Sequence, residues 1–175
     1  MTTLPDSAFP DGIEPRHTRP GAMGWRFLPL LLLGALLALA LSGALGGRPN
    51  PVVTARSPAV DLAFKAPTIL RNGEFFEMRV TATARRPIAR PVLAVSATYL
   101  HDLTINSFIP AASKEGFEDG MFVFEFEPLP AGKALEIKLD GQVNPPLVGV
   151  NAGTLQLRDG DRALATLRSQ LRVLP

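Results

Sequence analysis

The chain has 175 residues, no cysteine and a formal net charge of only +2. A chain of this length has room for one domain with appended segments. The lack of cysteine excludes a disulfide scaffold, a thiolate metal site and a cysteine nucleophile. The small net charge, without a basic stripe interleaved with aromatic residues, argues against nucleic-acid binding.

Residues 1–23 contain four evenly spaced prolines and show no apolar periodicity. A segment of this composition cannot bury enough apolar surface to offset the entropy lost on ordering. We therefore expect a disordered tail, which we place in the cytoplasm.

The next segment, 24–47, predicts a transmembrane helix. Residues 27–47 form a run of 21 residues without a charge, ten of them leucine. At a rise of about 1.5 Å per residue, this run spans about 32 Å, close to the ~30 Å hydrocarbon core of a bilayer. Trp25 and Arg26 stand where an interfacial aromatic residue and a cytoplasmic positive charge are common. The lipid bilayer is thus the first expected partner, through residues 27–47.

The charges around this run favour one orientation weakly. Arg16, Arg19 and Arg26 precede it, whereas Arg48 and Arg56 follow it. The excess of arginine on the N-terminal side fits the positive-inside rule. We expect a single-pass protein of the bacterial inner membrane, with its N-terminus in the cytoplasm and its C-terminal domain in the periplasm or outside the cell.

A cleaved signal peptide is the alternative. Ser42, Gly43 and Ala44 follow the apolar run 28–41 and resemble a small-residue cleavage site. The mature chain would then be a secreted module.

Beyond the apolar run, residues 48–58 contain three prolines and predict a semi-extended linker. Residues 59–175 then alternate apolar and polar side chains with period 2, which predicts half-buried strands. Turn residues such as Asn72-Gly73 and Asp159-Gly160 separate them, and the latter predicts a hairpin. Phe124 is expected to point inward from a central strand. The eight expected strands are 60–66, 74–84, 91–97, 103–109, 120–127, 133–143, 153–158 and 162–173.

Two stretches carry a resemblance to a known family. The segment RNGEFFEMRVTATAR (71–85) and the segment PLPAGKALEIKLDGQV (128–143) resemble the repeat-type bacterial immunoglobulin-like domains of exported proteins. The resemblance covers roughly residues 58–173. It implies an all-β, immunoglobulin-like sandwich of about seven to eight strands, with a role in adhesion, spacing or partner binding and no catalytic residues.

Few residues suggest chemistry. His101 and Asp102 form an adjacent pair, but neighbours in a strand point to opposite faces, so we do not expect their side chains to hydrogen-bond. Glu115, Glu118 and Asp119 lack the spaced ligands of a calcium loop. No glycine-rich phosphate loop is present either. We expect no catalytic, metal or cofactor residue and no nucleotide partner.

Apolar residues in the connections 98–119 and 144–148 are the best candidates for partner binding. They either pack over the open end of the sandwich or form an exposed docking surface. The leading hypothesis is a non-enzymatic, membrane-anchored extracytoplasmic domain that docks on another envelope or membrane protein. The alternatives are a secreted glycan- or polymer-binding module and a hydrolase that uses His101. The six candidate partner-binding residues are Tyr99, Leu103, Phe108, Ile109, Phe117 and Leu147.

Overall fold

The structure is a computed structural model that describes Trp25, residues 27–44 and residues 46–175. The chain divides into two compact units, Met1–Ala44 and Leu45–Pro175. The tail expected at 1–23 lies outside the described residues.

The described part of the first unit includes the helix α2 (Leu28–Leu41), with the sequence LPLLLLGALLALAL. Pro29 stands in the first turn, where its missing N–H has no partner to lose. All faces of the helix are apolar and none of its side chains is buried. Among the described residues, no helix has both the length and the hydropathy needed to cross a bilayer.

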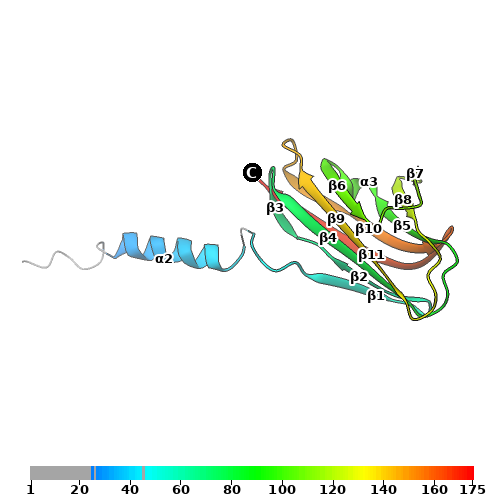
Figure 1. The fold of residues 1–175 in the computed structure, drawn as a ribbon. Helices are drawn as coiled ribbons and strands as arrows, with labels where there is room; N and C mark the ends of the chain where they lie inside the picture. Colours follow the sequence, from blue (N-terminus) through cyan, green and yellow to red (C-terminus); the bar gives the residue numbers. More distant parts are fainter. Residues whose placement is uncertain (1–24, 26, 45) are drawn as a thin grey trace, which may run out of the picture. The chain divides into compact units, whose positions relative to one another are not determined.

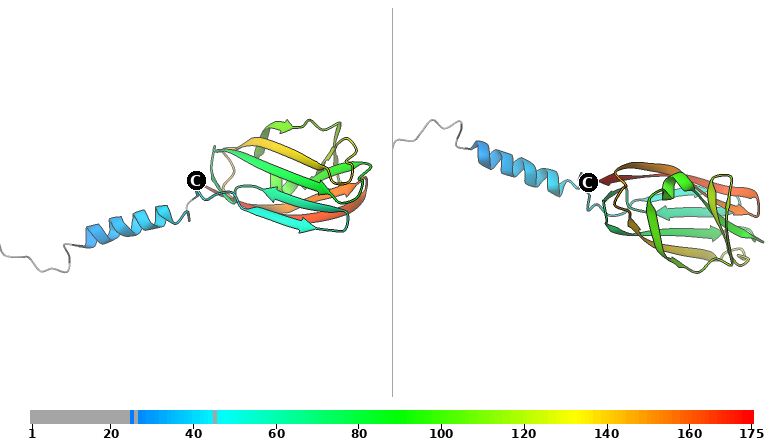
Figure 2. Two further views of the ribbon diagram at one scale, coloured as in Figure 1. Left: turned by 60° about the horizontal axis from the view of Figure 1, so that its bottom comes forward. Right: turned by 90° about the horizontal axis from the view of Figure 1, so that it is seen from above.

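The second unit is a sandwich of two β-sheets, seen from three directions in Figures 1 and 2. The short helix α3 (Ala97–Leu100) follows β5. The first sheet contains, in spatial order, β1 (Val52–Arg56), β2 (Val60–Lys65), β4 (Phe75–Ala84), β9 (Ala134–Val143) and β6 (Leu103–Ile109). The second sheet contains β3 (Ile69–Arg71), β11 (Arg162–Leu174), β10 (Gly149–Asp159), β5 (Pro91–Ser96), β8 (Met121–Glu125) and β7 (Lys114–Glu118).

The central strands follow the immunoglobulin arrangement. The neighbours β2, β4 and β9 correspond to strands A, B and E, and the neighbours β11, β10 and β5 correspond to G, F and C. The departure lies between β5 and β9, where the chain enters the first sheet as β6 and then returns to the second as the hairpin β7–β8. The expected all-β sandwich is confirmed.

All eight expected strands are present, and three others were not predicted. β1 occupies residues 52–56 of the expected linker, so that part of the linker prediction is wrong: its β-branched residues pair with β2, while the flanking prolines stay outside the pairing. β3 is only three residues long. β7 lies within the expected connection 98–119, and its central Gly116 interrupts the apolar–polar alternation.

The core lies between the sheets and follows the period-2 pattern. Phe64, Val80 and Ile137 of the first sheet are at most 2% exposed, and Leu93 and Leu157 of the second are fully buried. Full burial of such a side chain stabilises the fold by roughly 1.5–3 kcal/mol.

The prediction for Phe124 is confirmed in part. Its side chain is half-buried and packs against the core, as expected. However, β8 is the last strand but one of its sheet and not a central strand.

Candidate interaction surface

The sandwich ends on one side at two edge strands, β6 of the first sheet and β7 of the second. Phe108 of β6 stacks on Phe124 of β8, with ring centroids 4.5 Å apart. The opposite sheet therefore covers β8, while β7 lies one strand further out. All five residues of β7 are exposed. We call residues 114–125, which form β7, the turn and β8, the margin hairpin.

A two-residue turn fixes the register of the margin hairpin. Glu118 pairs with Met121, and Asp119 and Gly120 between them have φ values of 50° and 75°. Positive φ at both central residues defines a type I′ turn, whose twist matches that of antiparallel strands, and Asp-Gly is a favoured sequence for it.

One face of the margin hairpin exposes an aromatic pair. Phe117 lies opposite Phe122, and their rings meet edge to face with centroids 5.1 Å apart. Phe117 is 58% exposed and Phe122 is 38% exposed. Two adjacent aromatic rings that the domain itself leaves accessible form an apolar spot of the kind that occurs at interfaces.

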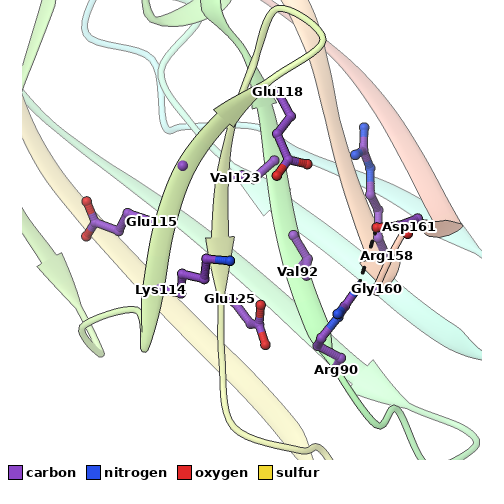
Figure 3. A pocket seen from close by; sticks show the side chains of 11 residues that line it. Arg90, Val92, Lys114, Glu115, Glu118, Val123, Glu125, Arg158, Gly160 and Asp161 are labelled. Carbon is purple, nitrogen blue, oxygen red and sulfur yellow. Dashed lines mark hydrogen bonds and ion pairs between the residues drawn. The ribbon is translucent and has the colours of Figure 1, made fainter.

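The other face of the margin hairpin borders a cavity of about 180 Å³, drawn in Figure 3. Val92, Val123 and Gly116 form its apolar part. A Cβ atom on residue 116 would lie 3.2 Å from Val123 Cγ2, so any side chain at this position would crowd Val123 and narrow the cavity. Side chains of both charges surround the cavity. The positive ones are Arg90, Lys114 and Arg158, and the negative ones are Glu115, Glu118, Glu125 and Asp161.

The two arginines of this cavity already have partners within the domain. Arg90 Nη2 lies 3.4 Å from Asp161 Oδ1. Arg158 donates from Nε to Gln156 Oε1 at 2.9 Å and from Nη2 to Met121 Sδ at 3.1 Å. An anionic ligand would have to compete with these contacts.

The outer face of the first sheet carries a network of ions. Lys138 Nζ lies 3.1 Å from Glu77 Oε2 and 3.2 Å from Asp140 Oδ1. Hydrogen bonds from Arg79 and then Lys138 lower the pKa of Glu77, and the Ser107 hydroxyl, followed by Lys138, lowers the pKa of Asp140. Hydrogen bonds to the two carboxylates raise the pKa of Lys138. Ion pairs this accessible to water contribute little to folding.

The expectation that His101 and Asp102 stay apart is wrong. His101 Nδ1 lies 3.1 Å from Asp102 Oδ2. Both residues occupy a turn and not a strand, and Asp102 has a φ of 53°, so strand alternation does not apply to them. Both side chains are accessible to solvent, and neither lines the cavity beside the margin hairpin.

Tyr99 belongs to a buried cluster at the end of the sandwich. Its side chain is fully buried, which raises the pKa of its hydroxyl, and Ser169 Oγ donates to this hydroxyl at 3.3 Å. The buried Asn151 donates from Nδ2 to the carbonyl oxygens of Tyr99 and His101. A Cβ atom on Gly153 would lie 1.9 Å from Ser96 Oγ, so this close packing requires glycine.

The structure does not bring the six candidate partner-binding residues into one surface. Tyr99 and Leu147 are buried in the core. Leu103 and Phe108 are half-buried against it. Only Ile109 and Phe117 are exposed, and they lie on different sheets: Ile109 of β6 pairs with Lys138, whereas Phe117 belongs to β7. For these two residues, partner binding stays a prediction.

Sequence reasoning did not single out Phe122 or the cavity on the opposite face. If Asp119-Gly120 is interpreted as the turn of a hairpin whose first strand is residues 114–118, that hairpin places Phe122 beside Phe117.

Glu115 and Glu118 of the margin hairpin do not converge. Glu115 pairs with Phe124 and Glu118 pairs with Met121, so their side chains leave opposite faces of β7, as Figure 3 shows. Within the described part of the chain, no three histidine, aspartate or glutamate side chains are placed to hold a metal ion.

No family model and no curated protein matches this chain. Similar solved structures include the CARDB domain of a Pyrococcus furiosus protein in complex with di-metal ions (10% identity, 70% of this chain, 95% of that chain, TM-score 0.43). The sulfur carrier protein SoxY from Chlorobium limicola is similar at 15% identity over 81% of this chain and 99% of its own, with a TM-score of 0.40. A chain of the CaDoc0917–CaCohA2 complex is similar at 12% identity over 61% and 94%, with a TM-score of 0.40. At these sequence identities and TM-scores, the similarities do not assign a function to this chain.

Proposed function

We propose that this protein is a membrane-anchored, non-enzymatic interaction domain that docks on another envelope or membrane protein. The observation that carries the proposal is the exposed pair of Phe117 and Phe122 on the margin hairpin. Large aromatic side chains dominate the binding energy of many interfaces, because each buries a large area at a low cost in side-chain entropy. The type I′ turn and the β5–β8 and β7–β8 ladders set the backbone positions from which the two rings project.

The proposed anchor is the uncharged segment 27–47, which contains α2. Its support comes from composition: leucine and phenylalanine each favour insertion by about 0.3–0.6 kcal/mol, and the segment has ten leucines and one phenylalanine. The proposed orientation places the N-terminus in the cytoplasm and the sandwich on the other side of a bacterial inner membrane.

The topology is tested with the full chain. A reporter enzyme that is active only outside the cytoplasm, fused after Pro175, should be active, and the intact mass should be recovered from the membrane fraction. Recovery of a soluble chain that begins near residue 45 would contradict the anchor and favour the secreted module.

The docking surface is tested by a matched pair of substitutions in the full chain. Phe117 and Phe75 are both exposed phenylalanines, at 58% and 70%, but Phe75 begins β4 in the other sheet. Phe117→Ser should abolish the migration of the protein in a larger complex on native gels of solubilised membranes. Phe75→Ser should leave that complex unchanged. Equal effects of the two substitutions, or no effect of Phe117→Ser, would contradict docking through the aromatic pair.

A further inference from the structure

In the part of the chain that the structure describes, one edge of β7 has no paired strand. The hydrogen bonds between β5 and β8 show which backbone N–H and C=O groups of β7 point to that edge. Two bonds flank the pairing of β5 with β8: Ala97 N–H donates to Gly120 O and Phe126 N–H donates to Pro91 O, both at 2.9 Å. In an antiparallel ladder, successive residues direct their N–H and C=O groups to opposite sides. The register therefore directs the polar groups of Met121, Val123 and Glu125 towards β7.

On β7 itself, the partners of those three residues are Glu118, Gly116 and Lys114, so these bond to β8. The alternate residues Glu115 and Phe117 direct their N–H and C=O groups away from β8. Because β7 is the last strand of its sheet, this side has no neighbouring strand within the described residues. Four backbone groups are thus available to an added strand.

The side chains of β7 decide which strand fits. Charges on an edge strand normally repel an approaching strand. The sequence Lys-Glu-Gly-Phe-Glu is, however, complementary to itself when read antiparallel about Gly116. In that register Lys114 of each copy lies opposite Glu118 of the other, and the two Gly116 residues lie opposite each other. Opposite charges at directly facing positions stabilise a strand pair, and like charges destabilise it.

The same register aligns the backbone. Glu115 of one copy faces Phe117 of the other, and these are the residues whose N–H and C=O groups point outward. Each of the two facing pairs exchanges two hydrogen bonds, which gives four in total. A two-fold axis through Gly116 relates the copies, as an isologous interface requires.

We propose that two copies of this chain pair antiparallel through β7, which joins their six-stranded sheets into one continuous sheet. This inference goes beyond the proposed function, because it concerns a second copy and not another protein. It brings both Phe117 side chains to the same face of the joined sheet and so doubles the aromatic spot. A five-residue edge is smaller than the ~1,000 Å² expected of a stable interface. The pairing is therefore weak in dilute solution and is favoured where copies are concentrated together, as on a shared membrane.

The chain contains no cysteine, so single cysteines report the register directly. The full chain with Gly116→Cys is expressed in its native host cells. Membranes from these cells are treated with oxygen and a copper catalyst and analysed on non-reducing gels. Facing Cα atoms in an antiparallel pair lie about 4.5–5.5 Å apart, within the ~4.4–6.8 Å range of disulfides. We expect a covalent dimer of twice the chain mass.

A second pair of variants removes the dependence on position 116, where a side chain would crowd Val123. Lys114→Cys and Glu118→Cys chains, given different tags and expressed together, should cross-link to each other. Neither should cross-link to itself, because two copies of residue 114 are offset by four residues, or about 13 Å. Like charges provide the last control: in the Gly116→Cys chain, Lys114→Glu should slow cross-linking roughly threefold to tenfold, and adding Glu118→Lys should restore it.

Three results would overturn the proposal. They are the absence of dimer both from Gly116→Cys and from the mixed pair, equal cross-linking of Lys114→Cys to itself and to Glu118→Cys, and a Gly116→Cys adduct with a different protein in place of the dimer. None of them bears on the native-gel comparison of Phe117→Ser with Phe75→Ser, so failure of the dimer and failure of partner docking are distinguishable.

Discussion

Leu147 and Phe117 are both apolar residues of connecting segments in the sequence, yet glutamate should affect them in opposite ways. Leu147 is 7% exposed and packs against the core cluster. Truncating a buried leucine costs about 2–5 kcal/mol, and burying a carboxyl group without a partner adds about 1–3 kcal/mol. Leu147→Glu should therefore destabilise the domain by at least ~3 kcal/mol. Phe117 is 58% exposed, so Phe117→Glu forfeits chiefly part of an aromatic pair worth about 0.5–1.5 kcal/mol.

Thermal melting of the two variants, followed by circular dichroism of the strand signal, separates these cases. For a domain of this size, 1 kcal/mol corresponds to a shift in Tm of roughly 3–5 °C. Leu147→Glu should lower Tm by about 10 °C or more, and Phe117→Glu by less than about 5 °C. A wild-type Tm for Leu147→Glu, or a large loss for Phe117→Glu, would refute the burial argument on which the interaction surface depends.

Three further outcomes follow from the contacts. Gly153→Ala should lower the free energy of unfolding by about 1–3 kcal/mol through overpacking, and a urea midpoint like that of the wild type would contradict the close approach at this glycine. Phe124→Ala should cost about 2 kcal/mol, less than the ~3–5 kcal/mol of a fully buried phenylalanine, and the same urea titration measures it. The lowered pKa values of Glu77 and Asp140 contribute stability that is present above their ordinary values of 4.5 and 3.8 and is lost as the pH falls through the folded values. Lys138→Gln should reduce this acid-side loss in urea midpoints taken between about pH 6 and pH 2, and an unchanged pH dependence would contradict the network.

Strand positions could be predicted wherever one face of a strand meets the core. In β9, Leu135, Ile137 and Leu139 alternate with charged residues because only one face of the strand is buried. The same signal is absent from β1 and β7, which are edge strands with few or no buried side chains. Their pairing depends on the neighbouring strand and on turn geometry, which local periodicity does not record.

The candidate surface was harder to predict than the fold. Tyr99 and Phe117 both lie in one apolar stretch of the chain, but Tyr99 belongs to α3, which packs against β10, while Phe117 projects beyond the opposite sheet. This difference depends on how the two sheets stack. The first sheet ends at β6, whose Phe108 stacks on Phe124 of β8, so β7 lies beyond the edge of the first sheet. Strand rules also failed for His101 and Asp102, because the chain turns there.

Docking through the margin hairpin is tested most directly by site-specific photo-cross-linking in intact membranes. A photoreactive phenylalanine analogue replaces Phe117 in one full-length chain and the equally aromatic, exposed Phe75 in another. Illumination of the first chain, and not of the second, should produce a discrete adduct with a membrane protein other than this chain. The absence of such an adduct at Phe117, or the same adduct from both positions, would contradict it.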